Sequence, residues 1–120
     1  MMVLLIDDDR DNVEICSALL EHHGFQVMAA GDVAAGVRIA CESRPAVVVT
    51  ELFARTASGW TVLEALRGRP ETAGIPIIVL SAHALPADRA AASGAAAFLT
   101  KPAYPGHVLE HVRRVCAAAA

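Results

Sequence analysis

Acidic, hydroxyl and ammonium side chains follow the apolar runs of this sequence. Asp7, Asp8 and Asp9 end the first run, Glu51 follows the third, and Ser81 and Lys101 follow the last two. Clustered carboxylates repel one another unless a cation lies between them. Carboxylate oxygens suit Mg²⁺, which takes one or two carboxylates and keeps waters or phosphate oxygens. An ammonium group and a hydroxyl can both hold an anionic oxygen. Brought together, these residue types indicate chemistry with Mg²⁺ and a phosphate.

The apolar runs that precede these residues are typical of buried parallel strands. The runs at residues 2–6, 45–50 and 75–80 are rich in Val, Ile and Leu and lack the alternation of a half-exposed strand, and those at residues 25–29 and 96–100 are weaker. Stretches with helical spacing and glycine or proline boundaries separate them. The predicted strands cover residues 2–6, 25–29, 45–50, 75–80 and 96–100, and the predicted helices cover residues 12–23, 32–42, 58–67, 86–93 and the segment from Pro105 onward.

Five strand–helix units in this order predict an α/β fold. Parallel strands joined by helical crossovers form a three-layer sandwich, here a five-stranded parallel sheet with five helices in a (βα)5 arrangement. In an open parallel sheet, ligands bind beyond the carboxyl ends of the strands, so the polar residues should meet at one edge. Asp9 is expected to cap the first helix rather than extend the acidic pocket. Ile15, Cys16, Leu19 and Leu20 are expected on the buried stripe of the first helix.

The composition limits the class of protein. The chain has 120 residues, of which 55% are hydrophobic and 19% charged, and its net charge is −3. One domain spanning residues 1–120 is the expectation at this length. The apolar content excludes disorder, and the acidic total argues against direct nucleic-acid binding. We expect no membrane span, since no apolar run reaches about 18 residues. Without a signal peptide, and with three cysteines that fit buried thiols, a cytoplasmic protein is predicted.

Four motifs together cover essentially the whole chain. They are residues 3–9 (VLLIDDD), residues 45–52 (PAVVVTEL) followed by Gly59, residues 75–82 (IPIIVLSA) and residues 98–102 (FLTKP). With them the sequence resembles the receiver domains of two-component response regulators, which share the flavodoxin-like fold of the chemotaxis response regulator. The resemblance implies a module of bacterial phosphorelay signalling and not an enzyme.

The resemblance also implies a role for each matched residue. Asp7 and Asp8 correspond to the acidic pair that holds Mg²⁺, with Asp8 favoured as the direct ligand. The backbone carbonyl of Phe53 corresponds to a further ligand. Ser81 corresponds to the switch hydroxyl that reaches toward the phosphoryl group in the active state. Lys101 corresponds to the lysine that pairs with the acceptor carboxylate and the phosphoryl oxygens.

Further matches concern the switch and the partner surface. Phe98 lies where the family has its aromatic switch residue, and the Lys101–Pro102 peptide matches one that is typically cis. The fourth helix, the fifth strand and the fifth helix correspond to the face that contacts signalling partners. Such a partner would be a histidine kinase, an output domain or another receiver, and a homodimer is a further option.

Glu51 is the main departure from the family pattern. The family accepts phosphate on an aspartate at the end of the third strand, whereas no aspartate occurs here between Asp32 and Asp88. The extra methylene of glutamate adds about 1.5 Å of reach, and phosphoryl transfer depends on positioning. The longer side chain could contact Lys101 or Ser81 as a phosphoryl group would. Glu51 could therefore mimic the active state or mark a degenerate site, and it could bind Mg²⁺ or exclude it.

Three hypotheses follow from this departure. The first is a pseudo-receiver that is not phosphorylated at Glu51 and acts by protein–protein contact. The second is a working Mg²⁺-dependent receiver that accepts phosphate. The third is a small Mg²⁺-dependent, phosphatase-like enzyme, which is disfavoured because the sequence contains no glycine-rich phosphate loop or cofactor fingerprint.

Overall fold

The computed structural model of the chain describes residues 1–51, 61–81, 94–100 and 104–119. Within them lie five strands and four helices, in an order that alternates strand and helix as far as β4. Their bounds are β1 (Met2–Ile6), α1 (Arg10–His22), β2 (Gln26–Ala30), α2 (Val33–Ser43), β3 (Val47–Glu51), α3 (Val62–Arg67), β4 (Ile77–Ser81), β5 (Ala97–Thr100) and α5 (Pro105–Ala119).

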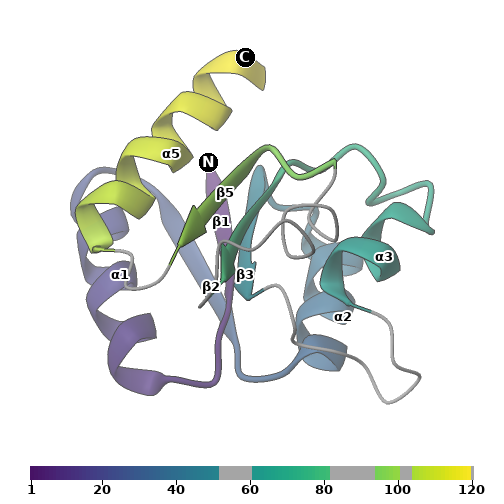
Figure 1. Cartoon of the computed structure of the whole chain (residues 1–120), viewed down its shortest axis with the longest axis horizontal. Helices are drawn as coiled ribbons and strands as arrows, with labels where there is room; N and C mark the ends of the chain where they lie inside the picture. The colour runs from purple at the N-terminus through teal and green to yellow at the C-terminus, as the bar shows by residue number, and fades with distance from the viewer. Residues whose placement is uncertain (52–60, 82–93, 101–103, 120) are drawn as a thin grey trace.

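The strands form one parallel sheet in the order β2-β1-β3-β4-β5. Helices α1 and α5 cover one face of this sheet, and α2 and α3 cover the other (Figure 1). The predicted three-layer, flavodoxin-like α/β fold is therefore confirmed. The helix predicted over residues 86–93 lies outside the described residues.

Prolines and a capping carboxylate set several element boundaries. The runs predicted as strands from Pro45 and from residue 75 begin two residues later, at Val47 and Ile77. Proline has no N–H to donate to a strand ladder, and Pro76 only accepts, from the N–H of Val48 at 3.0 Å. Helix α1 begins at Arg10 because the Asp9 carboxylate accepts from the backbone N–H groups of Asp11 and Asn12 in its first turn. The predicted capping role of Asp9 is confirmed.

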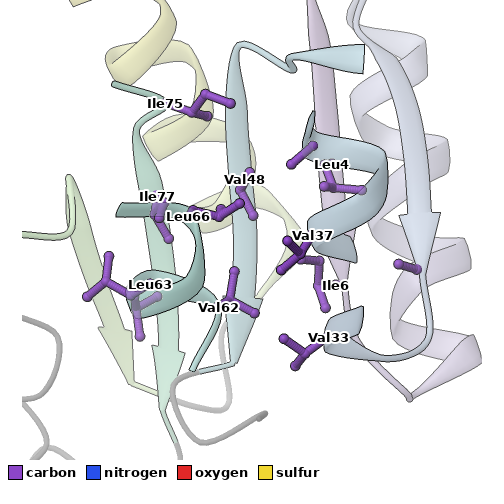
Figure 2. Close-up of a cluster of buried hydrophobic side chains, with 13 residues drawn as sticks. Leu4, Ile6, Val33, Val37, Val48, Val62, Leu63, Leu66, Ile75 and Ile77 are labelled. Carbon is purple, nitrogen blue, oxygen red and sulfur yellow. The ribbon is translucent and has the colours of Figure 1, made fainter. Parts of the chain in front are cut away.

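The side chains of alternate strand residues form two hydrophobic cores, one on each face of the sheet. Figure 2 shows the core beneath α2 and α3, in which side chains of β1, β3 and β4 meet those of the two helices. The second core lies beneath α1 and α5 and contains Val3, Leu5, Cys16, Leu20, Val47, Val49, Ile78, Leu80, Val108, Leu109, Val112 and Cys116.

One residue of the predicted buried stripe lies on the surface. Ile15 is 56% exposed, whereas Cys16 and Leu20 of the same helix are buried. Successive helix residues are about 100° apart, so a helix that points Cys16 at the sheet turns Ile15 away from it. The cysteines are free thiols; Cys16 and Cys116 are buried and Cys41 is half-buried. None of the helices in the described residues is long and apolar enough to cross a membrane.

Candidate functional site

The strand register brings the predicted site residues to one edge of the sheet. Ile6 of β1 lies opposite Thr50 of β3, so Asp7 and Glu51 follow at the same level on neighbouring strands. Such strands lie about 4.8 Å apart. On the other side, Glu51 pairs with residue 80 of β4, and Ser81 is the next residue. Two carboxylates and a hydroxyl therefore end three adjacent strands at the same edge.

The alternation of side chains divides these residues between the two faces of the sheet. Leu5 and Val49 belong to the core beneath α1 and α5. Asp7 and Glu51 come two residues later along the same strands, so they project toward the same face. Ser81 follows Ile77 and Val79 on the opposite face of β4, beneath α2 and α3, and is buried. The acids thus share one side of the strand edge, and the hydroxyl approaches it from the other.

Hydrogen bonds hold both oxygens of the Asp7 carboxylate. Oδ1 accepts from the backbone N–H of Asp9 at 2.9 Å, and Oδ2 accepts from the side-chain Nδ2 of Asn12 at 2.8 Å. The backbone N–H of Asp7 donates to the Ala30 carbonyl at 3.0 Å, which extends the pairing of β1 with β2. Asp7 is half-buried, whereas Asp8 is exposed. Asp7 is therefore the fixed member of the acidic pair.

The contacts of Asn12 continue inward to a buried thiol. The Sγ of Cys16 lies 3.9 Å from Oδ1 of Asn12, as a weak donor to that oxygen. Burial raises the pKa of the Cys16 thiol above its ordinary value of 9.0, and the negative charge of Asp7 raises it further. The thiol therefore keeps its proton at neutral pH. A cavity of about 10 Å³, with room for at most one water, is lined by Leu5, Ile6, Asp7, Asn12, Val13, Cys16, Val49, Leu80 and Val108.

An open groove of about 450 Å³ borders the acidic pair on the side of β2. Asp7, Asp8, Arg10 and Glu14 line it, together with Gly31 after β2 and neighbouring apolar residues. Arg10 brings a positive charge to the rim of a mostly acidic surface. The groove makes this side of the acidic pair accessible from solvent.

The donor chemistry at the strand edge fits Mg²⁺. In the part of the chain that the structure describes, no group of three or more His, Cys, Asp or Glu side chains could hold a metal ion by itself. Mg²⁺ does not need such a group, because it takes one or two carboxylates and keeps several waters. Asp7, Asp8 and Glu51 offer only the oxygen donors that this ion prefers. A cation bound there would supply positive charge beside a phosphate group.

Several predicted site residues lie outside the described residues. They are Phe53, Lys101 and Pro102, so their contacts and the form of the Lys101–Pro102 peptide stay predictions. Phe98 is half-buried and packs against the core beneath α2 and α3. Of the predicted set, the structure brings Asp7, Asp8, Glu51 and Ser81 to the strand edge.

Asn12 is the residue of this site that the sequence analysis missed. There it served only as the start of the predicted helix. A signal was present, because capping of α1 by Asp9 places Asn12 in the first turn of the helix. A side chain in that turn can reach back to the end of the preceding strand.

Comparison with known proteins defines the class. Residues 3–113 match the response regulator receiver domain family. The chain belongs to this family, and it is a receiver domain of two-component signalling. Domains of this family typically bind Mg²⁺, which agrees with the donor set at the strand edge.

Relatives in sequence include proteins of similar and of greater length, and a solved structure shows the same fold. Protein PilH of Pseudomonas aeruginosa is 29% identical over 96% of this chain and 97% of its own length. The DNA-binding dual master transcriptional regulator RpaA of Synechocystis is 34% identical over 92% of this chain, which spans only 47% of that protein. A response regulator from Desulfuromonas acetoxidans superposes with a TM-score of 0.89 at 24% identity, covering 99% of this chain and 98% of its own. This chain thus spans about half of one relative and nearly all of another.

Proposed function

We propose that this receiver domain is a pseudo-receiver, which is not phosphorylated at Glu51 and transmits its signal by protein–protein contact. The proposal is carried by the register of β1 and β3. With Ile6 opposite Thr50, Glu51 is the acidic residue that ends β3 at the level of Asp7. This register argues against a shifted alignment that would put another acid there.

The length of the Glu51 side chain explains the proposed loss of phosphoryl transfer. Because Asp7 is held at both oxygens, its carboxylate cannot easily shift to follow a displaced acceptor. The extra methylene moves the attacking oxygen by about 1.5 Å. A misplacement of about 1 Å can cost roughly 100-fold in rate when a reaction depends on positioning. Glu51 would then hold a negative charge close to where a phosphoryl group would lie.

The remaining parts of the proposal concern the cation, the partner and the location. Asp7, Asp8 and Glu51 would hold Mg²⁺ with the carbonyl of Phe53, more weakly than an aspartate site because Glu51 crowds the ion. The partner would be a histidine kinase, an output domain or another receiver, including a second copy. It would contact the face formed by the fourth helix, β5 and α5. The protein would act in the cytoplasm as a signalling module and not as an enzyme.

Two alternatives make different predictions about phosphate. A working receiver would form an acyl phosphate on Glu51 in a Mg²⁺-dependent reaction. A phosphatase-like enzyme would release inorganic phosphate with turnover. The carboxylates at the strand edge permit either reaction chemically, and the pseudo-receiver is favoured because the extra methylene of Glu51 displaces the acceptor oxygen.

Phosphorus NMR of the wild-type protein with acetyl phosphate and Mg²⁺ separates the three functions. We expect no protein-bound acyl phosphate signal, and we expect acetyl phosphate to decay at the rate measured without protein. A protein-bound signal that disappears in Glu51→Gln would establish the working receiver. Release of inorganic phosphate in excess of the protein that persists in Glu51→Gln, without a protein-bound acyl phosphate signal, would establish the enzyme. Either of these results would overturn the proposal.

A further inference from the structure

The two contacts of the Asn12 side chain fix the direction of its amide. Nδ2 faces the Asp7 carboxylate at 2.8 Å, and Oδ1 faces the Cys16 thiol at 3.9 Å. An amide carbonyl turned toward the carboxylate would be repelled, and Nδ2 turned toward the protonated thiol would meet its weakest acceptor. Both neighbours therefore favour the same orientation of the side chain.

This orientation restrains the Asp7 carboxylate. Its two oxygens receive donors from different parts of the chain, the backbone at Asp9 and the side chain of Asn12. Rotation of the carboxylate would break at least one of these bonds, and bonds to a charged group are stronger than neutral ones. Each oxygen still has a further lone pair for a cation. The amide is neutral, so it holds the carboxylate and leaves its negative charge available to a bound cation. A lysine or arginine in its place would neutralise that charge.

We propose that Asn12 is a positioning residue, whose amide holds the Asp7 carboxylate in the orientation that binds a divalent cation at the strand edge. This inference rests on the magnesium pocket of the proposed function. Residues that hold a metal ligand by a hydrogen bond typically contribute 10–100-fold to metal affinity. Half-buried Asp7 has no other side-chain donor among the described residues that could replace Asn12.

The test is the affinity for Mg²⁺ alone, measured by isothermal titration calorimetry on the full chain. We expect Asn12→Ala to bind Mg²⁺ about 10-fold more weakly than the wild type. Ser17→Ala is the matched control, because Ser17 is an uncharged, half-buried residue later in the same helix, and it should bind as the wild type does. Asn12→Leu keeps the bulk of the side chain and provides a second variant if Asn12→Ala does not fold.

A spectroscopic measurement separates positioning from a role in folding. In the wild type, the side-chain NH₂ resonances of Asn12 should shift during the Mg²⁺ titration with the calorimetric affinity, and Asp7→Asn should abolish this shift. Wild-type affinity for Mg²⁺ in a folded Asn12→Ala protein would overturn the role of Asn12 and leave the magnesium pocket unaffected. Failure of the wild type to bind Mg²⁺ at millimolar concentration would overturn the magnesium pocket and the inference with it. Phosphorylation of Glu51 would overturn the pseudo-receiver and leave the role of Asn12 intact.

Discussion

Beneath α2 and α3, every buried residue of the core is aliphatic. Helix α2 approaches the sheet closely there, because a Cβ at Gly36 would lie 2.7 Å from Cγ1 of Ile6 and closer still to its Cδ1. Beneath α1 and α5, the core includes two thiols, Cys16 and Cys116. That face also contains the small cavity and the polar contacts that lead from Cys16 to Asp7.

The two faces differ in which site residues belong to them: Asp7 projects toward the face beneath α1 and α5, whereas Ser81, which is buried, and Phe98 belong to the mostly aliphatic face beneath α2 and α3. A tightly packed aliphatic face resists small changes of volume. It therefore holds the ends of β1 and β3 at the same level relative to each other. Beneath α1 and α5 the packing is less tight. A small cavity lies there, and the side chains of Asn12 and Cys16 bring polar groups close to Asp7. We expect substitutions of the aliphatic core residues beneath α2 and α3 to change mainly stability, and substitutions beneath α1 and α5 to change how the site responds to ions and pH.

The largest expected effect is on the aliphatic face, at Gly36. Gly36→Val would force side-chain atoms into Ile6 and should lower the free energy of unfolding by about 3 kcal/mol. Urea denaturation measures this change. Combining it with Ile6→Ala conserves the total volume, so the double variant should be less destabilised than the sum of the two single variants.

Gly106 provides the control for this prediction. It lies in α5, and an added Cβ there would meet nothing within 4 Å. Gly106→Val should change the unfolding free energy by only about 0.5 kcal/mol. Equal effects at Gly36 and Gly106 would show that α2 does not pack as closely on β1 as described.

A smaller loss of stability is expected at Arg67, which ends α3. Its guanidinium donates to the carbonyls of Ala73 at 2.8 Å, Ile75 at 2.9 Å and Gly94 at 3.2 Å. These bonds join α3 to the segments that enter β4 and β5. Arg67→Ala should lower the unfolding free energy by about 2 kcal/mol in urea denaturation. Arg67→Lys should not restore it, because one ammonium cannot reproduce the planar fork.

Arg69 is the matched control for Arg67, since it is an exposed arginine close by in the sequence. Arg69→Ala should have almost no effect on stability. If Arg67→Ala is equally silent, the three carbonyl contacts do not stabilise the layer beneath α2 and α3.

The smallest expected effect, when counted for each thiol, is a pH dependence from the opposite face. Burial raises the pKa of the Cys16 and Cys116 thiols above their ordinary value of 9.0. Above pH 9 the unfolded chain therefore loses thiol protons that the folded chain keeps. The unfolding free energy should fall as pH rises through this range, with a slope of at most about 1.4 kcal/mol per pH unit for each thiol.

Urea denaturation between pH 8 and pH 10 under reducing conditions measures this slope. The double variant Cys16→Ala, Cys116→Ala should lose part of it, even though the variant is less stable overall at pH 8. An unchanged slope would contradict the assignment of this pH dependence to the two buried thiols.

Most of the fold could be predicted from the sequence because the three central strands, β1, β3 and β4, are buried on both faces. Continuous Val, Ile and Leu runs indicated the three central strands, and weaker apolar runs indicated β2 and β5. Among the described residues, errors fell at element ends, such as Pro45 and the start of α1 at Arg10, and at Ile15. Ile15 could not be placed correctly because neighbouring apolar residues in an alanine-rich chain leave the rotation of α1 open. The contact with the sheet buries Cys16 and Leu20, as predicted, and leaves Ile15 exposed.

The site could be predicted in part. The polar residues that directly follow the apolar runs indicated the acids of the site, and the expected parallel sheet placed Asp7 and Glu51 at one edge. The role of Asn12 could not be predicted, because it depends on how α1 leaves its cap at Asp9 and on the rotamer that reaches Asp7. Side-chain contacts of this kind depend on angstrom-scale geometry that a sequence pattern does not specify.

Intact-mass spectrometry after incubation with acetyl phosphate and Mg²⁺ tests the central claim most directly. It compares the wild type with Glu51→Asp, which differs by one methylene at the end of β3. We predict that Glu51→Asp gains the mass of one phosphoryl group in a Mg²⁺-dependent manner, while the wild type gains none. A phosphoryl mass on the wild type that disappears in Glu51→Gln would contradict the claim that Glu51 silences this pocket, and so would an unmodified Glu51→Asp protein.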